Sequence, residues 1–140
     1  MPDSLTFSFD VDGRDFTSAG QASVKVKQNL RQIGIPAEII RRVSVAMYEG
    51  EINMVIHAGG GKAKVTVDEK CITIELCDKG PGIKDINKAM QEGYSTASEQ
   101  VRSLGFGAGM GLPNMKRYTD SMEINSVLGE GTQIIMTVNL

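Results

Sequence analysis

A run of alternating glycines constrains this chain more than any other feature of its sequence. Within residues 103–116 glycine stands at every second position, at Gly105, Gly107, Gly109 and Gly111. Glycine adopts positive φ without a steric penalty, which leaves backbone N–H groups free to approach an anion. Pro113 follows and suits the start of a helix, where its missing N–H costs nothing. The run therefore predicts a phosphate-binding loop that leads into a helix; a flexible surface loop is the alternative.

Length and composition describe an ordinary globular domain. The chain has 140 residues, of which 41% are hydrophobic and 23% are charged, and its formal net charge is −2. This length predicts a single domain over residues 1–140 with a core of its own. The charge balance argues against partners such as nucleic acid or an anionic membrane surface. Because no apolar run is long enough to span a bilayer and the N-terminus lacks a signal-peptide pattern, we expect a cytoplasmic protein.

A predicted helix over residues 36–57 carries polar side chains within its apolar face. Glu49 and Asn53 stand four residues apart and therefore lie on the same side of the helix. The apolar residues around them are Ile39, Val45, Ala46, Ile52 and Ile56. Placing a carboxylate and an amide in an apolar stripe costs several kcal/mol, roughly, unless they have partners. The pair predicts a base and a metal ligand lining a cleft; a buried hydrogen-bonded pair that joins helix to sheet is the alternative.

Other residues of the helical segments have structural interpretations. An earlier helix is expected over residues 15–33, where apolar residues recur at helical spacing. Glu51 points away from the row of Glu49 and Asn53, so we expect it to be solvated. His57 is near the end of the second helix and is expected to interact with the helix C-terminus rather than to catalyse.

Period-two alternation predicts strands over residues 5–11, 62–68, 71–78, 122–124 and 132–140. Asp78 ends one of these strands with the parity of its buried residues and is followed by Gly80 and Gly82. A carboxylate in this place is suited to accept a hydrogen bond from an exocyclic amine, and the glycines would let a flat ring approach the backbone. An ordinary Asp-x-Gly turn is the alternative. Residues 83–91 suit a short helix, residues 94–111 have no sustained period, and residues 113–118 resume a helix.

The order of these motifs along the chain resembles a known superfamily. Glu49-x-x-x-Asn53 is followed by Asp78-x-Gly80-x-Gly82, by the glycines of residues 105–111, and by Gly129-x-Gly131-Thr132. This set is similar to that of the Bergerat-fold ATPases, which include gyrase, heat-shock chaperones, histidine kinases and mismatch-repair ATPases. The resemblance implies an α+β fold: a two-layer α/β sandwich in which a mixed or antiparallel sheet carries helices on one face.

The resemblance also implies ATP and Mg²⁺ as cofactors and a role for each motif. Asn53 would be the magnesium ligand and Glu49 the catalytic base. Asp78 would bind adenine, with Gly80 and Gly82 beside the purine. These roles agree with the independent interpretation of the helix face and of the strand end.

The remaining nucleotide contacts that the resemblance implies lie in an ATP lid at about residues 93–111 and just beyond it. The lid glycines would contact the phosphates, and these are Gly105, Gly107, Gly109 and Gly111. Leu112 follows them in the nucleotide-binding set, and Thr132 would assist Asp78, often through a water.

Among the Bergerat branches, the compact stand-alone kinases fit best. We expect no transducer domain in this chain, and its only histidine, His57, stands on the ATP-site helix. The sequence around the lid most resembles the stressosome switch kinase of the anti-sigma-factor serine/threonine kinase group, apart from an additional charged piece at residues 97–102. The resemblance implies a STAS-domain antagonist protein as substrate, and a sigma factor or other output regulator and a homodimer as further partners. Sequestration of a sigma factor, or nucleotide-dependent regulation without phosphoryl transfer, are the alternatives.

Overall fold

The structure is a computed structural model, and it describes residues 4–13, 20–83, 86, 90 and 111–140. The strands of this part of the chain are β1 (Leu5–Asp12), β2 (Gly60–Val67), β3 (Cys71–Asp78), β4 (Ser121–Val127) and β5 (Gly131–Asn139). Its helices are α1 (Gln21–Gln32), α2 (Ala37–Ala58) and α5 (Gly111–Arg117). Of the short helix predicted over residues 83–91 only residues 83, 86 and 90 are described, and most of the predicted lid, with Gly105, Gly107 and Gly109, lies outside the described residues.

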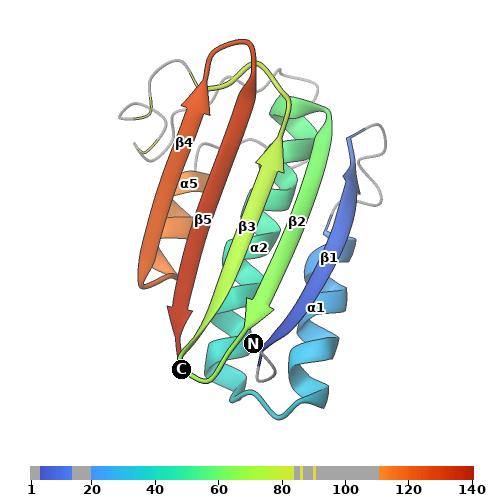
Figure 1. Cartoon of the computed structure of the whole chain (residues 1–140), viewed down its shortest axis with the longest axis vertical. Helices are drawn as coiled ribbons and strands as arrows, with labels where there is room; N and C mark the ends of the chain where they lie inside the picture. Colours follow the sequence, from blue (N-terminus) through green and yellow to red (C-terminus); the bar gives the residue numbers. More distant parts are fainter. Residues whose placement is uncertain (1–3, 14–19, 84–85, 87–89, 91–110) are drawn as a thin grey trace.

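The sheet has the strand order β1-β2-β3-β5-β4, and every neighbouring pair is antiparallel. The three helices cover one face of this sheet (Figure 1). The predicted two-layer α+β architecture is therefore confirmed, with the antiparallel form of the sheet. Hairpins connect β2 to β3 and β4 to β5. Strands β3 and β5 are also neighbours in the sheet, although α5 and β4 lie between them in the chain.

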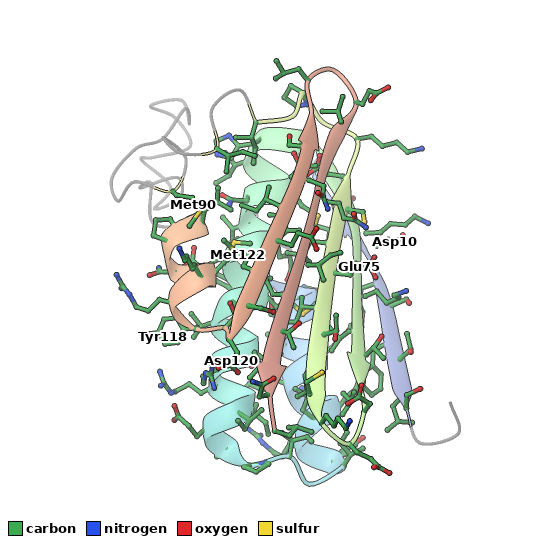
Figure 2. The ribbon with its side chains drawn as sticks, turned by 60° about the vertical axis from the view of Figure 1, so that its left-hand side comes forward. Asp10, Glu75, Met90, Tyr118, Asp120 and Met122 are labelled. Atoms are coloured by element: carbon green, nitrogen blue, oxygen red, sulfur yellow. The ribbon has the colours of Figure 1, made fainter. Side chains whose placement is uncertain are left out.

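The two faces of the sheet differ because side chains alternate along each strand. Residues toward the helices form the core; Val65, Ile74 and Met136 each have an exposed fraction of 0%. The opposite face carries polar residues, including the ion pairs Lys62–Asp10 at 3.7 Å and Lys64–Glu75 at 3.3 Å. Figure 2 shows Asp10 and Glu75 on this outer face. The alternation predicted from the sequence thus matches one covered face and one polar face.

Helix α2 runs along the middle of the helical layer and contacts α1, α5 and the sheet. Its buried stripe is not the one expected from the sequence. Ala46 and Ile52 are buried as predicted, but Ile39, Val45 and Ile56 are only half-buried. The stripe is completed by Ile40, Val43, Met47, Met54 and Val55. The difference arises because neighbours on several sides widen the covered face, which a single-face helical pattern does not describe.

Glu51 is the clearest correction to the sequence interpretation, which placed it in solvent. Its exposed fraction is 2%, and its carboxylate accepts hydrogen bonds from the start of α1. The donors are the backbone N–H groups of Gly20, Ala22 and Ser23, and the Ser23 hydroxyl. First-turn N–H groups have no acceptor within their own helix, so a buried carboxylate can satisfy them. Helix α1 begins at Gln21 rather than at residue 15, and residues 14–19 are outside the described part.

Helix α5 begins two residues earlier than predicted, at Gly111. Pro113 is thus its third residue, still within the first turn, where a missing N–H removes no helical hydrogen bond. Leu112 and Met115 are buried in the core against α2. Figure 2 shows Met90 close to α5, and Met90 and Met122 pack at the margin of the same core. None of the helices in the described residues is both long enough and apolar enough to cross a membrane.

Candidate active site

The predicted site residues come from elements that meet at one end of the molecule. The C-terminal part of α2, the end of β3 and the β4–β5 hairpin lie together at the top of Figure 1. Helix α2 supplies Glu49 and Asn53, β3 supplies Asp78, and β5 supplies Thr132 near its start. Residues separated by up to 83 positions along the chain are therefore brought to one end of the fold.

Glu49 and Asn53 lie beside the first turns of α5. A Cβ atom placed on Gly111 would be 2.9 Å from Asn53 Nδ2 and 3.0 Å from Oδ1, so only glycine leaves room for this amide. One turn further along α5, Asn114 Nδ2 donates to Glu49 Oε1 at 3.4 Å. Both α2 side chains are half-buried. The row predicted from the sequence is therefore half-buried at the border of the core, next to the helix that follows the predicted lid.

Asn114 is a residue that the sequence interpretation missed. It stands three residues after Gly111, so both face α2 from one side of α5. Its amide oxygen is also 3.5 Å from Arg117 Nη1. The signal available in the sequence was this spacing of three residues, which could be used only once α5 was known to pack on α2.

Asp78 is held by backbone donors on one of its two carboxylate oxygens. Its Oδ1 accepts hydrogen bonds from the N–H of Gly80 at 2.9 Å and from the N–H of Thr132 at 3.2 Å. Neither of these bonds uses Oδ2. The carboxylate is therefore fixed in orientation, and no other described residue donates to Oδ2, which can accept a hydrogen bond from a ligand donor such as an exocyclic amine.

Gly80 and Gly82 have close packing contacts around this carboxylate. A Cβ atom on Gly80 would lie 2.6 Å from the Ala58 Cβ at the end of α2. Gly82 has φ +83°, and a Cβ there would approach the carbonyl oxygen of Val127 to 2.7 Å. The glycines thus let the segment after β3 pass between α2 and the β4–β5 hairpin. That they would lie beside a purine remains a prediction.

A row of polar side chains crosses three strands at this end of the sheet. Thr132 pairs with Asp78 on β3 and with Ser126 on β4, so the three side chains share one face. The hydroxyls of Ser126 and Thr132 are 2.9 Å apart, and Thr132 has an exposed fraction of 9%. Ser126 was missed by the sequence interpretation because the predicted strand ended at residue 124, and its pairing with Thr132 follows only from the register of β4 and β5.

The site offers few groups that could hold a metal ion by themselves. The described residues contain no cluster of three or more His, Cys, Asp and Glu side chains that would do so. Asn53 presents a carboxamide oxygen, which is a ligand type that Mg²⁺ accepts. Leu112, which was assigned to the nucleotide-binding set, has its side chain in the core, so only its backbone is left to meet a ligand.

Comparison with known proteins gives consistent matches over most of the chain. The sequence profile described as the histidine kinase-like ATPase domain matches residues 15–138. The serine/threonine-protein kinase RsbT of Bacillus subtilis is 35% identical over 108 residues, which cover 74% of this chain and 75% of RsbT. An anti-sigma F factor of Caldanaerobacter subterraneus is 37% identical over 112 residues, which cover 76% of this chain and 74% of that protein.

A solved structure agrees in fold. The crystal structure of the RsbU and RsbW domains of a Mycobacterium tuberculosis protein matches with a TM-score of 0.66 and 15% sequence identity. The match covers 96% of this chain and 32% of the mycobacterial chain. At this level of identity the likeness concerns the fold alone.

Proposed function

Because this chain belongs to the family of histidine kinase-like ATPase domains, we propose that it is an ATP-dependent protein serine/threonine kinase. The resemblance to Bergerat-fold ATPases of the anti-sigma-factor kinase group is confirmed by this membership and by the relatives named RsbT and anti-sigma F factor. The proposal covers the whole of residues 1–140 as one domain that acts in the cytoplasm.

The observation that carries the proposal is the convergence of two pairs of residues at one end of the sheet. Glu49 and Asn53 border α5, and Asp78 with Thr132 forms a backbone-anchored polar pair on the sheet. Phosphoryl transfer depends on positioning and on neutralisation of phosphate charge more than on covalent chemistry. In our assignment, Asp78 accepts a hydrogen bond from the adenine amino group, with Thr132 beside it. Glu49 accepts the proton of the attacking serine or threonine hydroxyl.

Magnesium fits this assignment through a single side chain. Mg²⁺ commonly takes one or two protein oxygens and completes its octahedron with phosphate oxygens and water. The Asn53 carboxamide next to Gly111 supplies one such oxygen. When bound, the ion would neutralise phosphate charge. In our assignment, Asn53 would hold the ion, and Gly105, Gly107, Gly109 and Gly111 would supply backbone N–H groups to the phosphates.

The substrate class that we propose is a STAS-domain antagonist protein, phosphorylated on serine or threonine in a bacterial partner-switching pathway. The support is the similarity to a named serine/threonine-protein kinase together with the similarity to anti-sigma F factors. Phosphorylation adds charge of about −1.5 to −2 to the antagonist, which is enough to release one partner in favour of another. A homodimer is the assembly that we propose for the kinase.

A transfer assay tests the proposal. The purified chain is mixed with ATP labelled at the γ-phosphate and with the STAS protein encoded near its gene. Wild type should transfer label to that protein. Glu49→Gln should abolish transfer while ATP still binds, and Glu130→Gln, in the exposed turn before β5, serves as the charge-matched control. Transfer that persists in Glu49→Gln would remove Glu49 as the base, and no transfer by wild type would contradict the kinase assignment.

Magnesium dependence is tested separately by thermal unfolding. ATP should raise the Tm of wild type more strongly with Mg²⁺ than with a chelator, because a ligand that binds only the folded state stabilises it. Asn53→Ala should lose the magnesium-dependent part and keep the rest. Asp78→Asn should lose the stabilisation by ATP altogether. An unchanged magnesium effect in Asn53→Ala would refute the assignment of Asn53.

A second candidate function is sequestration of a sigma factor. The observation that favours it is the 37% identity to an anti-sigma F factor over 76% of this chain. Co-purification of a sigma factor with the chain would support this function. If Asp78→Asn abolishes ATP binding but retains the sigma factor, sequestration is separable from nucleotide binding.

A further inference from the structure

Ser126 on β4 is the centre of a hydrogen-bond network that the proposed function does not use. Its hydroxyl accepts a hydrogen bond from the N–H of Ile83 at 2.7 Å. It lies 2.9 Å from the Thr132 hydroxyl and 3.4 Å from the carbonyl oxygen of Gly131. Ile83 follows the segment that carries Gly80 and Gly82, so one half-buried side chain joins that segment to β5.

The proton of Ser126 has two acceptors within reach. Because the hydroxyl already accepts from Ile83, its own single proton goes either to Thr132 Oγ1 or to the Gly131 carbonyl oxygen. Thr132 is closer by 0.5 Å, from 2.9 Å against 3.4 Å, and lies within the usual O–H···O range. Once Thr132 Oγ1 accepts from Ser126, its proton is free to point elsewhere. Either hydroxyl could donate across the 2.9 Å contact, and we assign Ser126 as the donor, which leaves Thr132 to donate toward its surroundings.

The neighbouring carboxylate has the opposite polarity. Asp78 Oδ1 is occupied by the N–H groups of Gly80 and Thr132, and the charged carboxylate can only accept. A base that meets both side chains encounters an acceptor at Asp78 and a donor at Thr132. Adenine presents the complementary pattern, an amino donor at position 6 and an acceptor at N1. Hypoxanthine presents the reverse, an oxo acceptor at position 6 and a donor at N1.

We propose that Ser126 is a positioning residue for base selectivity, which orients the Thr132 hydroxyl so that the Asp78–Thr132 pair favours a 6-amino purine over a 6-oxo purine. This inference rests on the proposed function, because it assumes that a nucleoside triphosphate binds at this end of the sheet. Without Ser126, the Thr132 hydroxyl can rotate and accept a proton from the wrong base. The preference for ATP over ITP should then fall more than the affinity for the triphosphate, which both nucleotides share.

The test measures the ratio of the Kd for ITP to the Kd for ATP by calorimetry in the full chain with Mg²⁺. Ser126→Ala should lower this ratio by about 3- to 10-fold, the range expected for one hydrogen bond. Ser126→Cys keeps the size but loses the strong donor, so it should resemble Ser126→Ala and serves if that variant folds poorly. Ser126→Thr restores a hydroxyl and should restore the ratio. Ser121→Ala, on the same strand at an exposed position, is the control.

A double-mutant cycle separates positioning from a general structural effect. In a Thr132→Val background, Ser126→Ala should change the ITP to ATP ratio no further, because the group that it orients is gone. Equal weakening of ATP and ITP by Ser126→Ala, or an unchanged ratio, would overturn the inference and leave Ser126 a hairpin residue. Failure of wild type to bind either nucleotide would instead refute the proposed function, and this inference with it.

Discussion

The Ser23 hydroxyl donates a 2.7 Å hydrogen bond to Oε1 of Glu51, and the Ser23 backbone N–H donates to the same oxygen at 3.0 Å. The other oxygen, Oε2, accepts from the N–H groups of Gly20 and Ala22. One buried carboxylate of α2 thus satisfies the first turn of α1. Glu51 stands between Glu49 and Asn53 in the sequence, so the helix that carries the proposed base also fixes the start of its neighbour.

Replacing Glu51 with alanine should destabilise the fold by about 2–4 kcal/mol, because several buried donors lose their acceptor at once. The measurement is the free energy of unfolding from urea denaturation. Glu69→Ala, in the exposed β2–β3 turn, is the matched control and should change that free energy by less than about 0.5 kcal/mol. A Glu51→Ala variant as stable as the control would contradict the capping role.

Gly50 allows α2 to approach the sheet, and Gly50→Ala should be destabilising. A Cβ atom there would lie 2.1 Å from Leu76 Cδ1 and 3.3 Å from Met115 Cε, so core side chains would have to move. We expect a loss of about 1–3 kcal/mol despite the better helix propensity of alanine. Ser44→Ala is the control in the same helix. The Ser44 hydroxyl is buried without a hydrogen-bond partner in the described part of the chain, so its removal should be neutral or stabilising.

Gly111→Ala should affect the ligand site more than the fold. The new Cβ atom would lie within 3.2 Å of three atoms of the Asn53 amide, which is the free end of a side chain and can be displaced. The unfolding free energy without ligand should therefore change little, while the Kd for Mg-ATP should rise several-fold. Calorimetry with and without Mg²⁺ measures this effect. An unchanged Kd would show that the Asn53 amide does not contact the bound complex.

Asn114→Ala should slow phosphoryl transfer without weakening ATP binding. The Asn114 amide donates to Glu49 Oε1 at 3.4 Å, a long bond that orients the carboxylate rather than neutralising it. We expect kcat to fall by about 3- to 10-fold, the range for the loss of one ordinary hydrogen bond, because this one is long, with the Kd for ATP unchanged. The measurement is single-turnover transfer to the protein substrate. An increase in Kd with unchanged kcat would assign Asn114 to nucleotide binding instead.

Asp120 should contribute to acid sensitivity of the fold. The Asn139 N–H donates to Asp120 Oδ2 at 2.6 Å, and Arg42 Nη2 lies 3.2 Å from Oδ1; the hydrogen bond first, and then Arg42, lower the pKa of this carboxyl. Figure 2 shows Asp120 where α5 passes into β4, with Tyr118, whose carbonyl oxygen accepts from Arg42 Nε.

The direction in which stability changes with pH follows from the lowered pKa of Asp120. Between the folded-state pKa and the unfolded value of about 3.9, the unfolded chain binds more protons, so stability rises with pH. The contribution is present above about pH 4 and is lost as the pH falls through the folded-state pKa. Asp120→Asn should therefore flatten the acid limb of a plot of unfolding free energy against pH. An acid limb as steep as that of Glu130→Gln would show that Asp120 does not contribute.

The sequence predicted the features that repeat along an element. The strands follow from period-two alternation, and Glu49 and Asn53 from helical spacing; each needs only neighbours in the chain. The predictions that differ from the structure concern which face of a helix is buried and where a helix begins. Ile39 and Val45 were placed in the buried stripe of α2 but are half-buried, and α5 begins two residues before Pro113. Helix ends and the breadth of a covered face depend on what packs against the helix, which no local pattern contains.

By itself, the sequence determined the fold class, the order of the motifs and most of the polar residues that we propose for the nucleotide site. Only the tertiary structure decided how those residues are oriented. It buried Glu51 against α1, set Asn114 beside Glu49, and aligned Ser126 with Thr132 and Asp78 across β4, β5 and β3. The reason is that a hydrogen bond between distant segments depends on strand register and helix packing, and these are fixed by the whole core rather than by the residues that form the bond.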